Sequence, residues 1–178
     1  MTLKCTADRY GQVAILFHWI AALFIVLLLA SGFRAVGTLD PAARLLMLRF
    51  HVVAGVMVGV LTLGRAAWWM FADRKPAPVA GPSALSGRIA AIVHALFYVV
   101  ILGMAASGIG MLALAGAGAV LFGGAAGELP DFWNYLPRVP HGAGARLLVV
   151  LLLLHVGGAL YHHVVRRERV LARIGLFR

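Results

Sequence analysis

Hydrophobic residues lie in long, nearly unbroken runs, and polar residues gather between the runs. Four of the runs are each about twenty residues long, enough to cross a bilayer as a helix. A backbone in lipid must satisfy its hydrogen bonds internally, which favours helices over open strands. The sequence therefore predicts an all-α, integral membrane four-helix bundle in a single transmembrane domain over residues 1–178, with spans at about 11–33, 44–70, 88–114 and 142–165.

The connections between the runs carry turn-forming and interfacial residues. Asp40–Pro41 indicates a turn or a helix start, and the proline-rich stretch 73–82 predicts an exposed loop. The glycine-rich stretch 115–127 could extend the third span or lie along the membrane surface, and Phe132, Trp133 and Tyr135 are typical of the headgroup level. We expect the basic tail that follows the fourth span to lie on the lipid surface.

Composition agrees with a membrane protein. Hydrophobic residues make up 62% of the chain and charged residues 12%, against about 25% charged residues in soluble proteins. A net charge of +10 could suit nucleic acid, but the basic residues lie between the spans, so we expect no nucleic-acid partner. Cys5 is the only cysteine, which excludes an intramolecular disulfide and a CxxCH haem attachment.

The distribution of basic residues predicts the orientation of the bundle. Of the sixteen Lys and Arg residues, eleven lie in the N-terminal segment, the second connection and the tail. Only five lie on the other side: Arg34, Arg44, Arg49, Arg138 and Arg146. The positive-inside rule then predicts that both termini lie in the cytoplasm.

Histidines recur inside the predicted spans, where an ionisable side chain is costly and marks a functional site by default. On the fourth span His141 and His155 are fourteen residues apart, which is about 21 Å along a helix and only about 40° around it. His162 lies seven residues further on, at nearly the same angle. One face of one helix is therefore predicted to carry imidazoles at three depths.

The other spans supply histidines at matching depths. His51 lies near the outer end of the second span, at the depth of His141. Depth alone therefore predicts that these two side chains form a pair. On the cytoplasmic side the alternatives stay open among four histidines: His18, His94, His155 and His162.

Three chemistries use histidines of this kind. They are haem iron with two axial imidazoles, a proton pathway, and a soft-metal site with Cys or Met ligands. The predicted spans contain no Asp or Glu, which argues against proton pumping and hard metals. A lone histidine could simply hydrogen-bond a neighbouring helix. Two histidines on one helix about four turns apart, opposite His18 and His51, favour haem, and nearby glycines would admit a macrocycle: Gly55, Gly157 and Gly158.

These motifs resemble the bacterial cytochrome b561 family over nearly the whole chain. The resemblance is carried by FHW at residues 17–19, HVVAG at 51–55 and the spacing of His141 and His155 before His162–His163. It implies a multi-pass protein of the bacterial inner membrane with two haem b groups. It further implies that His51 and His141 bind the outer haem iron and that His18 and His155 bind the inner one. His94 stays a further candidate for binding the cofactor.

Some members of that family with this short architecture are superoxide oxidases, which reduce ubiquinone. The resemblance therefore implies superoxide as donor and ubiquinone as acceptor. Arginines cluster near the outer histidines, and a positive cluster would attract a small anion: Arg44, Arg49, Arg138 and Arg146. Equally, these arginines could anchor helix ends or pair with haem propionates. We single out Arg49 and Arg138 as candidates for steering superoxide.

The cytoplasmic side carries the candidates for quinone chemistry. His162 could hydrogen-bond a quinone carbonyl and pass it a proton, whereas His163 points about 100° away and is expected to be interfacial. His94 could serve a propionate, the quinone or packing alone.

Two alternative functions stay open besides superoxide oxidation. One is a quinone-reactive electron-transfer subunit for a periplasmic redox partner, such as a hydrogenase-type enzyme. The other is a structural or transport bundle in the membrane lipid, without redox chemistry.

Overall fold

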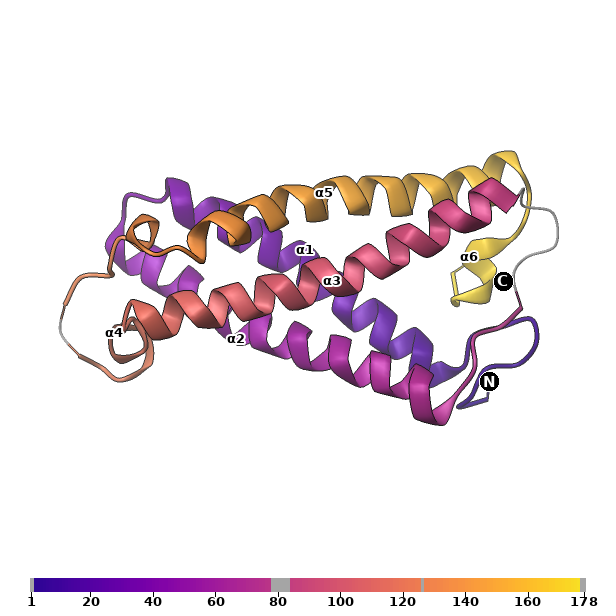
Figure 1. Ribbon diagram of the computed structural model, residues 1–178, viewed down its shortest axis with the longest axis horizontal. Helices are drawn as coiled ribbons and strands as arrows, with labels where there is room; N and C mark the ends of the chain where they lie inside the picture. The colour runs from indigo at the N-terminus through magenta and orange to yellow at the C-terminus, as the bar shows by residue number, and fades with distance from the viewer. Residues whose placement is uncertain (1, 78–83, 126, 177–178) are drawn as a thin grey trace.

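The structure is a computed structural model that describes residues 2–77, 84–125 and 127–176. Its four long helices are α1 (Gln12–Gly37), α2 (Pro41–Ala67), α3 (Ala84–Leu114) and α5 (Arg138–Leu160) (Figure 1). Single π-helical turns extend two of them, η1 (Trp68–Ala72) after α2 and η3 (Tyr161–Val165) after α5. The short elements are α4 (Gly118–Phe122), the 3₁₀ turn η2 (Phe132–Asn134) and α6 (Val170–Arg173). The described residues form no strand, and the predicted all-α four-helix architecture is confirmed.

The long helices are arranged as two neighbouring pairs. α1 packs along α2, α3 packs along α5, and α2 joins the pairs by packing against α3. Both termini and α6 lie at one end of the bundle, and α4 lies at the other (Figure 1). We call these the terminal end and the α4 end. The predicted orientation would place the terminal end in the cytoplasm, and it stays a prediction.

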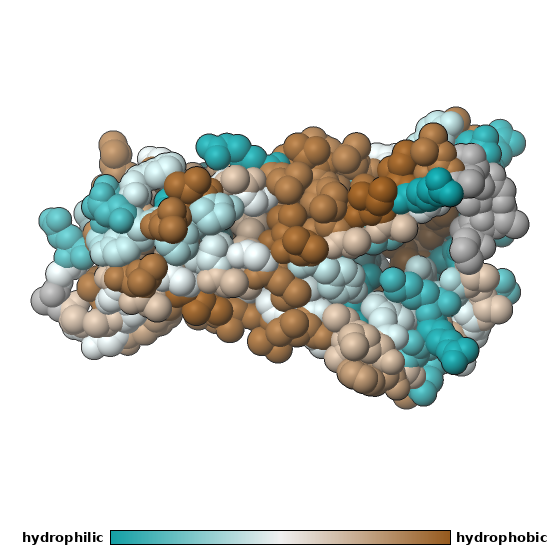
Figure 2. All heavy atoms as spheres, viewed as in Figure 1, coloured by the Kyte–Doolittle hydropathy of each residue, from teal (hydrophilic) through white to brown (hydrophobic). Residues whose placement is uncertain are grey.

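The apolar surface of the bundle suits a membrane. All four long helices are long and apolar enough to span one. The core between them is small, and it consists of Ile25, Val58, Val93, Val100, Leu148 and Leu151. Large side chains at mid-helix positions instead face outward; Leu153, for example, is 70% exposed. Hydrophobic side chains cover the middle of the face in Figure 2, and hydrophilic ones gather mainly towards the ends. We expect lipid to cover this middle band, because exposure of so much apolar surface to water is unfavourable.

The helix ends follow from local chemistry. α2 begins at Pro41, where the missing N–H costs nothing, and the Asp40 carboxylate accepts a hydrogen bond from the Ala42 N–H at 3.0 Å. This confirms the helix start predicted there. α3 ends at Leu114, because Gly116 has a φ of +60° that breaks the helix. Residues 118–122 then form α4, so the stretch 115–127 does not continue the third helix.

The expectation that the tail lies along the lipid surface stays a prediction. Its described part contacts α1 and the N-terminal segment: the Trp19 indole N–H donates to the Ile174 carbonyl at 3.1 Å, and the Tyr10 N–H donates to the Arg173 carbonyl at 3.2 Å. The Arg173 guanidinium donates to the carbonyls of Asp8 and Ala77 at 2.8 and 2.7 Å. The exposed loop predicted over 73–82 is described only as far as residue 77, and its prolines at 78 and 82 lie outside the described residues.

Candidate functional site

The structure brings His51 of α2 and His141 of α5 together near the α4 end. Their ring centroids are 6.1 Å apart, and their ring planes make an angle of 65°. A metal–imidazole bond is about 2 Å long and the ring centroid lies about 1 Å behind the nitrogen, so two axial imidazoles on one iron have centroids about 6 Å apart. The two side chains therefore fit a shared haem iron.

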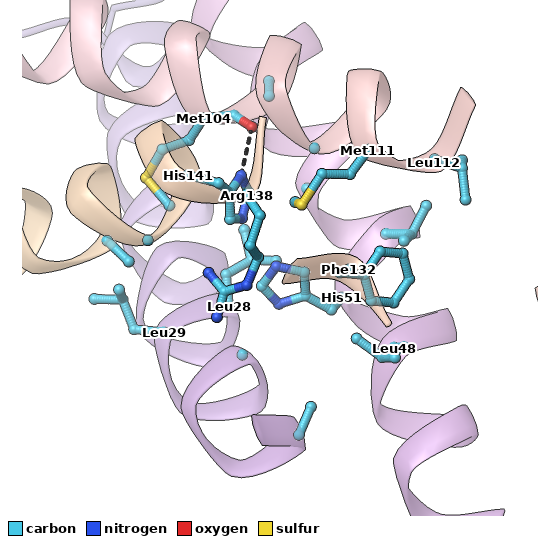
Figure 3. A pocket seen from close by; sticks show the side chains of 18 of the residues that line it. Leu28, Leu29, Leu48, His51, Met104, Met111, Leu112, Phe132, Arg138 and His141 are labelled. Atoms are coloured by element: carbon cyan, nitrogen blue, oxygen red, sulfur yellow. Dashed lines mark hydrogen bonds between the residues drawn. The ribbon is translucent and has the colours of Figure 1, made fainter. Parts of the chain in front are cut away.

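Hydrogen bonds hold both of these rings by the same nitrogen. His51 Nδ1 lies 3.1 Å from Ser31 Oγ on α1, and His141 Nδ1 lies 3.0 Å from Ser107 Oγ on α3. The Met104 carbonyl lies 3.1 Å from the same nitrogen of His141 (Figure 3). Nε2 is then the nitrogen left to bind a metal ion on each ring.

A cavity of about 360 Å³ surrounds this pair, a volume within the range of cofactor sites. Its walls are mostly apolar side chains from α1, α2, α3 and α5, and Gly55 is among the lining residues, as expected of a glycine beside a macrocycle. Three arginines also line it, Arg44, Arg138 and Arg146. Arg138 reaches into the space between the histidines and the helices around them (Figure 3). The cavity combines two metal-binding nitrogens with a positively charged wall.

The arginines at the α4 end differ in what they contact. The Arg138 guanidinium lies 4.3 Å from the ring centroid of Trp133, within cation–π range. Arg146 donates to the Gly142 carbonyl at 3.3 Å. Arg49 donates through Nε to the Leu121 carbonyl and is not among the residues that line the cavity. Arg49 thus fastens α4 to α2, and the steering role predicted for it stays a prediction.

A second group of rings lies nearer the terminal end. His18 of α1 and His155 of α5 have centroids 6.0 Å apart, which again fits two ligands of one iron. His94 of α3 is also close, with its centroid 5.3 Å from that of His155. Phe97 lies against His155 at 5.4 Å. The structure therefore brings three of the four open candidates together. The 6.0 Å separation of His18 and His155 is closer to that of two ligands of one iron than the 5.3 Å between His94 and His155.

His162, the fourth candidate, has a different neighbour. Its Nδ1 lies 2.6 Å from a carboxylate oxygen of Glu168, and the other carboxylate oxygen accepts from Arg166 Nε at 3.3 Å. The hydrogen bond from His162 is the main cause that lowers the pKa of Glu168 below its ordinary 4.5, and Arg166 lowers it further. The carboxylate contact at 2.6 Å fixes the orientation of the His162 ring.

The remaining predicted residues are placed as follows. A Cβ at Gly157 or Gly158 would contact no neighbouring helix within 4 Å, so the role beside a macrocycle expected for these glycines stays a prediction. His163 lies in the π-helical turn η3, and its ring Nδ1 is shielded from solvent. Among the described residues no group of three or more His, Cys, Asp or Glu is arranged to hold a metal ion. Haem iron needs only the pairs that are present.

Sequence reasoning missed the hydrogen-bonding partners of the histidines. Ser31 and Ser107 each lie in the sequence Ala-Ser-Gly, and its occurrence in two apolar runs is the signal that could have found them. Glu168 follows His162 by six residues and is the first acidic residue after the fourth span. One turn that reverses the chain brings the two together, which spacing along a helix does not predict.

Comparison with known proteins agrees with this geometry. The family model described as prokaryotic cytochrome b561 matches residues 9–175. A protein of Escherichia coli K12, "Cytochrome b561 homolog 1", is 26% identical over 181 residues, covering 94% of this chain and 97% of that protein. The resemblance noted in the sequence is thereby confirmed, as is a multi-pass protein of the bacterial inner membrane. The chain belongs to the prokaryotic cytochrome b561 family, whose members are membrane electron-transfer proteins that bind haem b.

Proposed function

We propose that the chain binds two haem b groups and transfers electrons from superoxide at the α4 end to ubiquinone at the terminal end. The observation that carries the proposal is the presence of two imidazole pairs, at 6.1 and 6.0 Å, at two levels of one bundle. When bound, haem b accepts and releases single electrons at a potential set by its ligands and surroundings. Two such sites would connect the two faces of the membrane.

In this proposal His51 and His141 hold the iron at the α4 end, and His18 and His155 hold the iron at the terminal end. Each pair joins two helices that are not neighbours in the sequence. The choice of His18 over His94 rests on distance, since 5.3 Å between His94 and His155 is shorter than two ligands of one iron require. His94 then contacts the cofactor without binding its iron.

Superoxide is the proposed donor because of the charge around the outer cavity. Arg44, Arg138 and Arg146 line it, and no Asp or Glu is among its described lining residues. Haem b carries two propionate carboxylates, so three guanidinium groups leave one positive charge in excess even if both carboxylates are paired. A positive site with apolar walls raises the encounter rate with a small anion. Arg138 is the main steering residue in this proposal, and Arg49 contributes charge from outside the cavity.

Ubiquinone is the proposed acceptor at the terminal end, where His162 would bind it. The Glu168 carboxylate, 2.6 Å from Nδ1, orients the ring of His162. In the proposal a doubly protonated His162 donates Nε2–H to a quinone carbonyl and releases that proton as the quinone is reduced. Both termini would lie in the cytoplasm, so this proton would come from the cytoplasmic side.

The overall reaction balances when two protons are taken up from the cytoplasmic side. Two superoxide anions each lose one electron and leave as O₂. One ubiquinone gains two electrons and two protons and becomes ubiquinol.

Stopped-flow spectroscopy of the purified protein tests the proposal. Mixing with superoxide should reduce the haem within the mixing time, and a short-chain ubiquinone should reoxidise it. The rate of reduction should fall as ionic strength rises, because salt screens the guanidinium charges. Haem that superoxide leaves oxidised, or reduction at a rate independent of salt, would contradict the proposal.

A quinone-reactive subunit for a periplasmic redox partner is the second candidate. It is favoured by the exposed apolar side chains at the α4 end, where Trp133 is 64% and Leu136 83% exposed. Such side chains could dock a protein or rest among lipid headgroups. Haem that superoxide fails to reduce, together with an active complex isolated with a partner, would favour this candidate.

A further inference from the structure

The same three residues, Ala-Ser-Gly, lie beside both histidines at the α4 end. In α1 they are residues 30–32, next to His51, and in α3 they are residues 106–108, next to His141. Each copy belongs to the helix that packs alongside the histidine's own helix, α1 against α2 and α3 against α5. The two halves of the bundle therefore place the same local structure against the two rings.

The serine of each copy connects a ring to the helix backbone. Ser31 Oγ donates to the Leu28 carbonyl at 3.1 Å, and Ser107 Oγ donates to the Met104 carbonyl at 3.0 Å. With its proton used in this way, each oxygen can only accept from the imidazole at 3.1 or 3.0 Å. Nδ1 of each ring must then carry the proton, and the lone pair lies on Nε2. The serines thus select the tautomer that binds a metal through Nε2.

The glycine of each copy leaves room for the edge of the same ring. A Cβ built on Gly32 would lie 3.0 Å from Cε1 of His51, and one on Gly108 would lie 3.3 Å from Cε1 of His141. Both distances are shorter than ordinary van der Waals contact. Serine and glycine together set how far each ring approaches its neighbouring helix and how it is turned.

We propose that Ser31–Gly32 and Ser107–Gly108 are positioning residues that orient His51 and His141 and lower the reduction potential of the haem bound at the α4 end. The proposal rests on the proposed function through its assignment of these histidines as ligands. An imidazole that donates Nδ1–H to an acceptor becomes a stronger electron donor at Nε2. A stronger donor stabilises ferric over ferrous iron, which lowers the potential.

The terminal end lacks this arrangement. In the described part of the chain no serine hydroxyl is bonded to His18 or His155, whose neighbours are the rings of Trp19, His94 and Phe97. The effect of the serines is therefore confined to one of the two haems. Lowering the potential at the α4 end favours onward transfer of an electron to the terminal end.

Redox titration of the visible absorption bands tests the proposal with Ser31→Ala and Ser107→Ala. Both variants should raise the potential of one haem component and leave the other unchanged. Part of each shift should be offset, because the Met104 carbonyl remains as an acceptor for His141 and the Leu28 carbonyl remains as one for His51. Ser31→Thr and Ser107→Thr keep the hydroxyl and should titrate close to the unaltered protein.

Thr62→Val is the matched control. Thr62 is also a buried helical hydroxyl bonded to a carbonyl one turn back, that of Val58 at 2.7 Å, but it contacts neither ring. Its potentials should not change. Unshifted potentials in both alanine variants, or equal shifts in Thr62→Val, would overturn the proposal. If an alanine variant assembles without haem, retention of haem by the threonine variant supports the role of the hydroxyl, and loss in both overturns it.

The glycines provide an independent measurement. Gly32→Ala should change the ring orientation and hence the electron paramagnetic resonance spectrum of the ferric haem at the α4 end. Gly103→Ala is the control on α3, since a Cβ there meets nothing within 4 Å. Identical spectra for both variants would overturn the role of the glycine. Failure of the ligand assignment itself is distinguishable, because His51→Ala would then keep its full haem content.

Discussion

The two histidine pairs lie in one bundle at nearly equal ring separations, 6.1 and 6.0 Å, but in different surroundings. At the α4 end each ring is hydrogen-bonded to a serine of the neighbouring helix and lies in a cavity lined by arginines. At the terminal end the rings of His18 and His155 are surrounded by other rings. In the proposed function the shared separation is what iron would require of its ligands, and the different surroundings are what the protein can adjust.

The surroundings also differ in how open they are. The lining of the cavity at the α4 end includes the exposed side chain of Trp133 and the half-buried Arg138 that lies against its ring. The terminal end is covered by the N-terminal segment and α6, which are joined through Trp19 and Arg173 (Figure 1). This contrast suits a small, charged reactant at the α4 end and a larger, apolar one entering from the membrane at the other.

Removing one ligand at each level is expected to have the largest effect. His141→Ala should cost the haem at the α4 end, and His155→Ala the haem at the terminal end, so haem content per polypeptide should fall by about half in each. His94→Ala should keep the full content, because its ring is too close to His155 to share an iron. A pyridine haemochromogen assay on purified protein measures this. Full content in both ligand variants would refute the assignment, and a loss in His94→Ala would make that residue the ligand instead of His18.

The next largest effect concerns charge at the α4 end. Arg138→Ala should lower the rate constant for reduction by superoxide about tenfold at low ionic strength, since steering by charge contributes factors of about 10 to 1,000. Arg138→Lys should keep most of the rate. Arg49→Ala should have a weaker effect, because Arg49 is bonded to the Leu121 carbonyl and does not itself line the cavity. The rates come from stopped-flow measurements at several salt concentrations.

Arg74→Ala is the control for this prediction. Arg74 is an exposed arginine beyond η1, at the terminal end. Its loss removes the same charge from the protein but should leave the rate with superoxide unchanged. Equal slowing by Arg74→Ala and Arg138→Ala would mean that net charge matters and the cavity does not.

Much of the fold could be predicted from the sequence, because hydrophobic runs report directly on which segments lipid must cover. The helix ends were less predictable. α1 continues past Arg34 to Gly37, and α2 begins at Pro41, three residues earlier than expected. A charged residue marks where the apolar run ends, but the backbone stays helical until a capping residue or a glycine stops it.

Only part of the candidate site could be predicted from the sequence. Depth along a helix depends only on residue number, so the pairing of His51 with His141 could be predicted from the sequence. Choosing among the other four histidines required knowing how the helices face one another. Long-range contacts such as that between Trp19 and Ile174 determine where the tail lies, and they leave no periodic pattern in the sequence.

A smaller effect is expected from Glu168→Gln at the terminal end. A neutral amide would weaken the contact that orients His162, so haem reoxidation by a short-chain ubiquinone should slow about threefold, as expected for a partly exposed pair of this kind. Reduction of the haem by superoxide should not change. Glu128→Gln, which alters an exposed carboxylate outside the helices, is the control. An unchanged reoxidation rate in Glu168→Gln would separate His162 from the quinone chemistry.

The smallest expected effect is the pH dependence of the tail. The pKa of Glu168 is lowered below 4.5, mainly by the hydrogen bond from His162, so its contribution to stability is present above that value and is lost as pH falls through the lower, folded pKa. At about pH 5.5 the amides of the tail should therefore exchange hydrogen faster in Glu168→Gln than in the unaltered protein. As the pH falls through the folded pKa, the difference between the two proteins should disappear, because the carboxylate becomes protonated. A difference that persisted at the lower pH would show that the glutamate holds the tail by its shape and hydrogen bonding rather than by its charge.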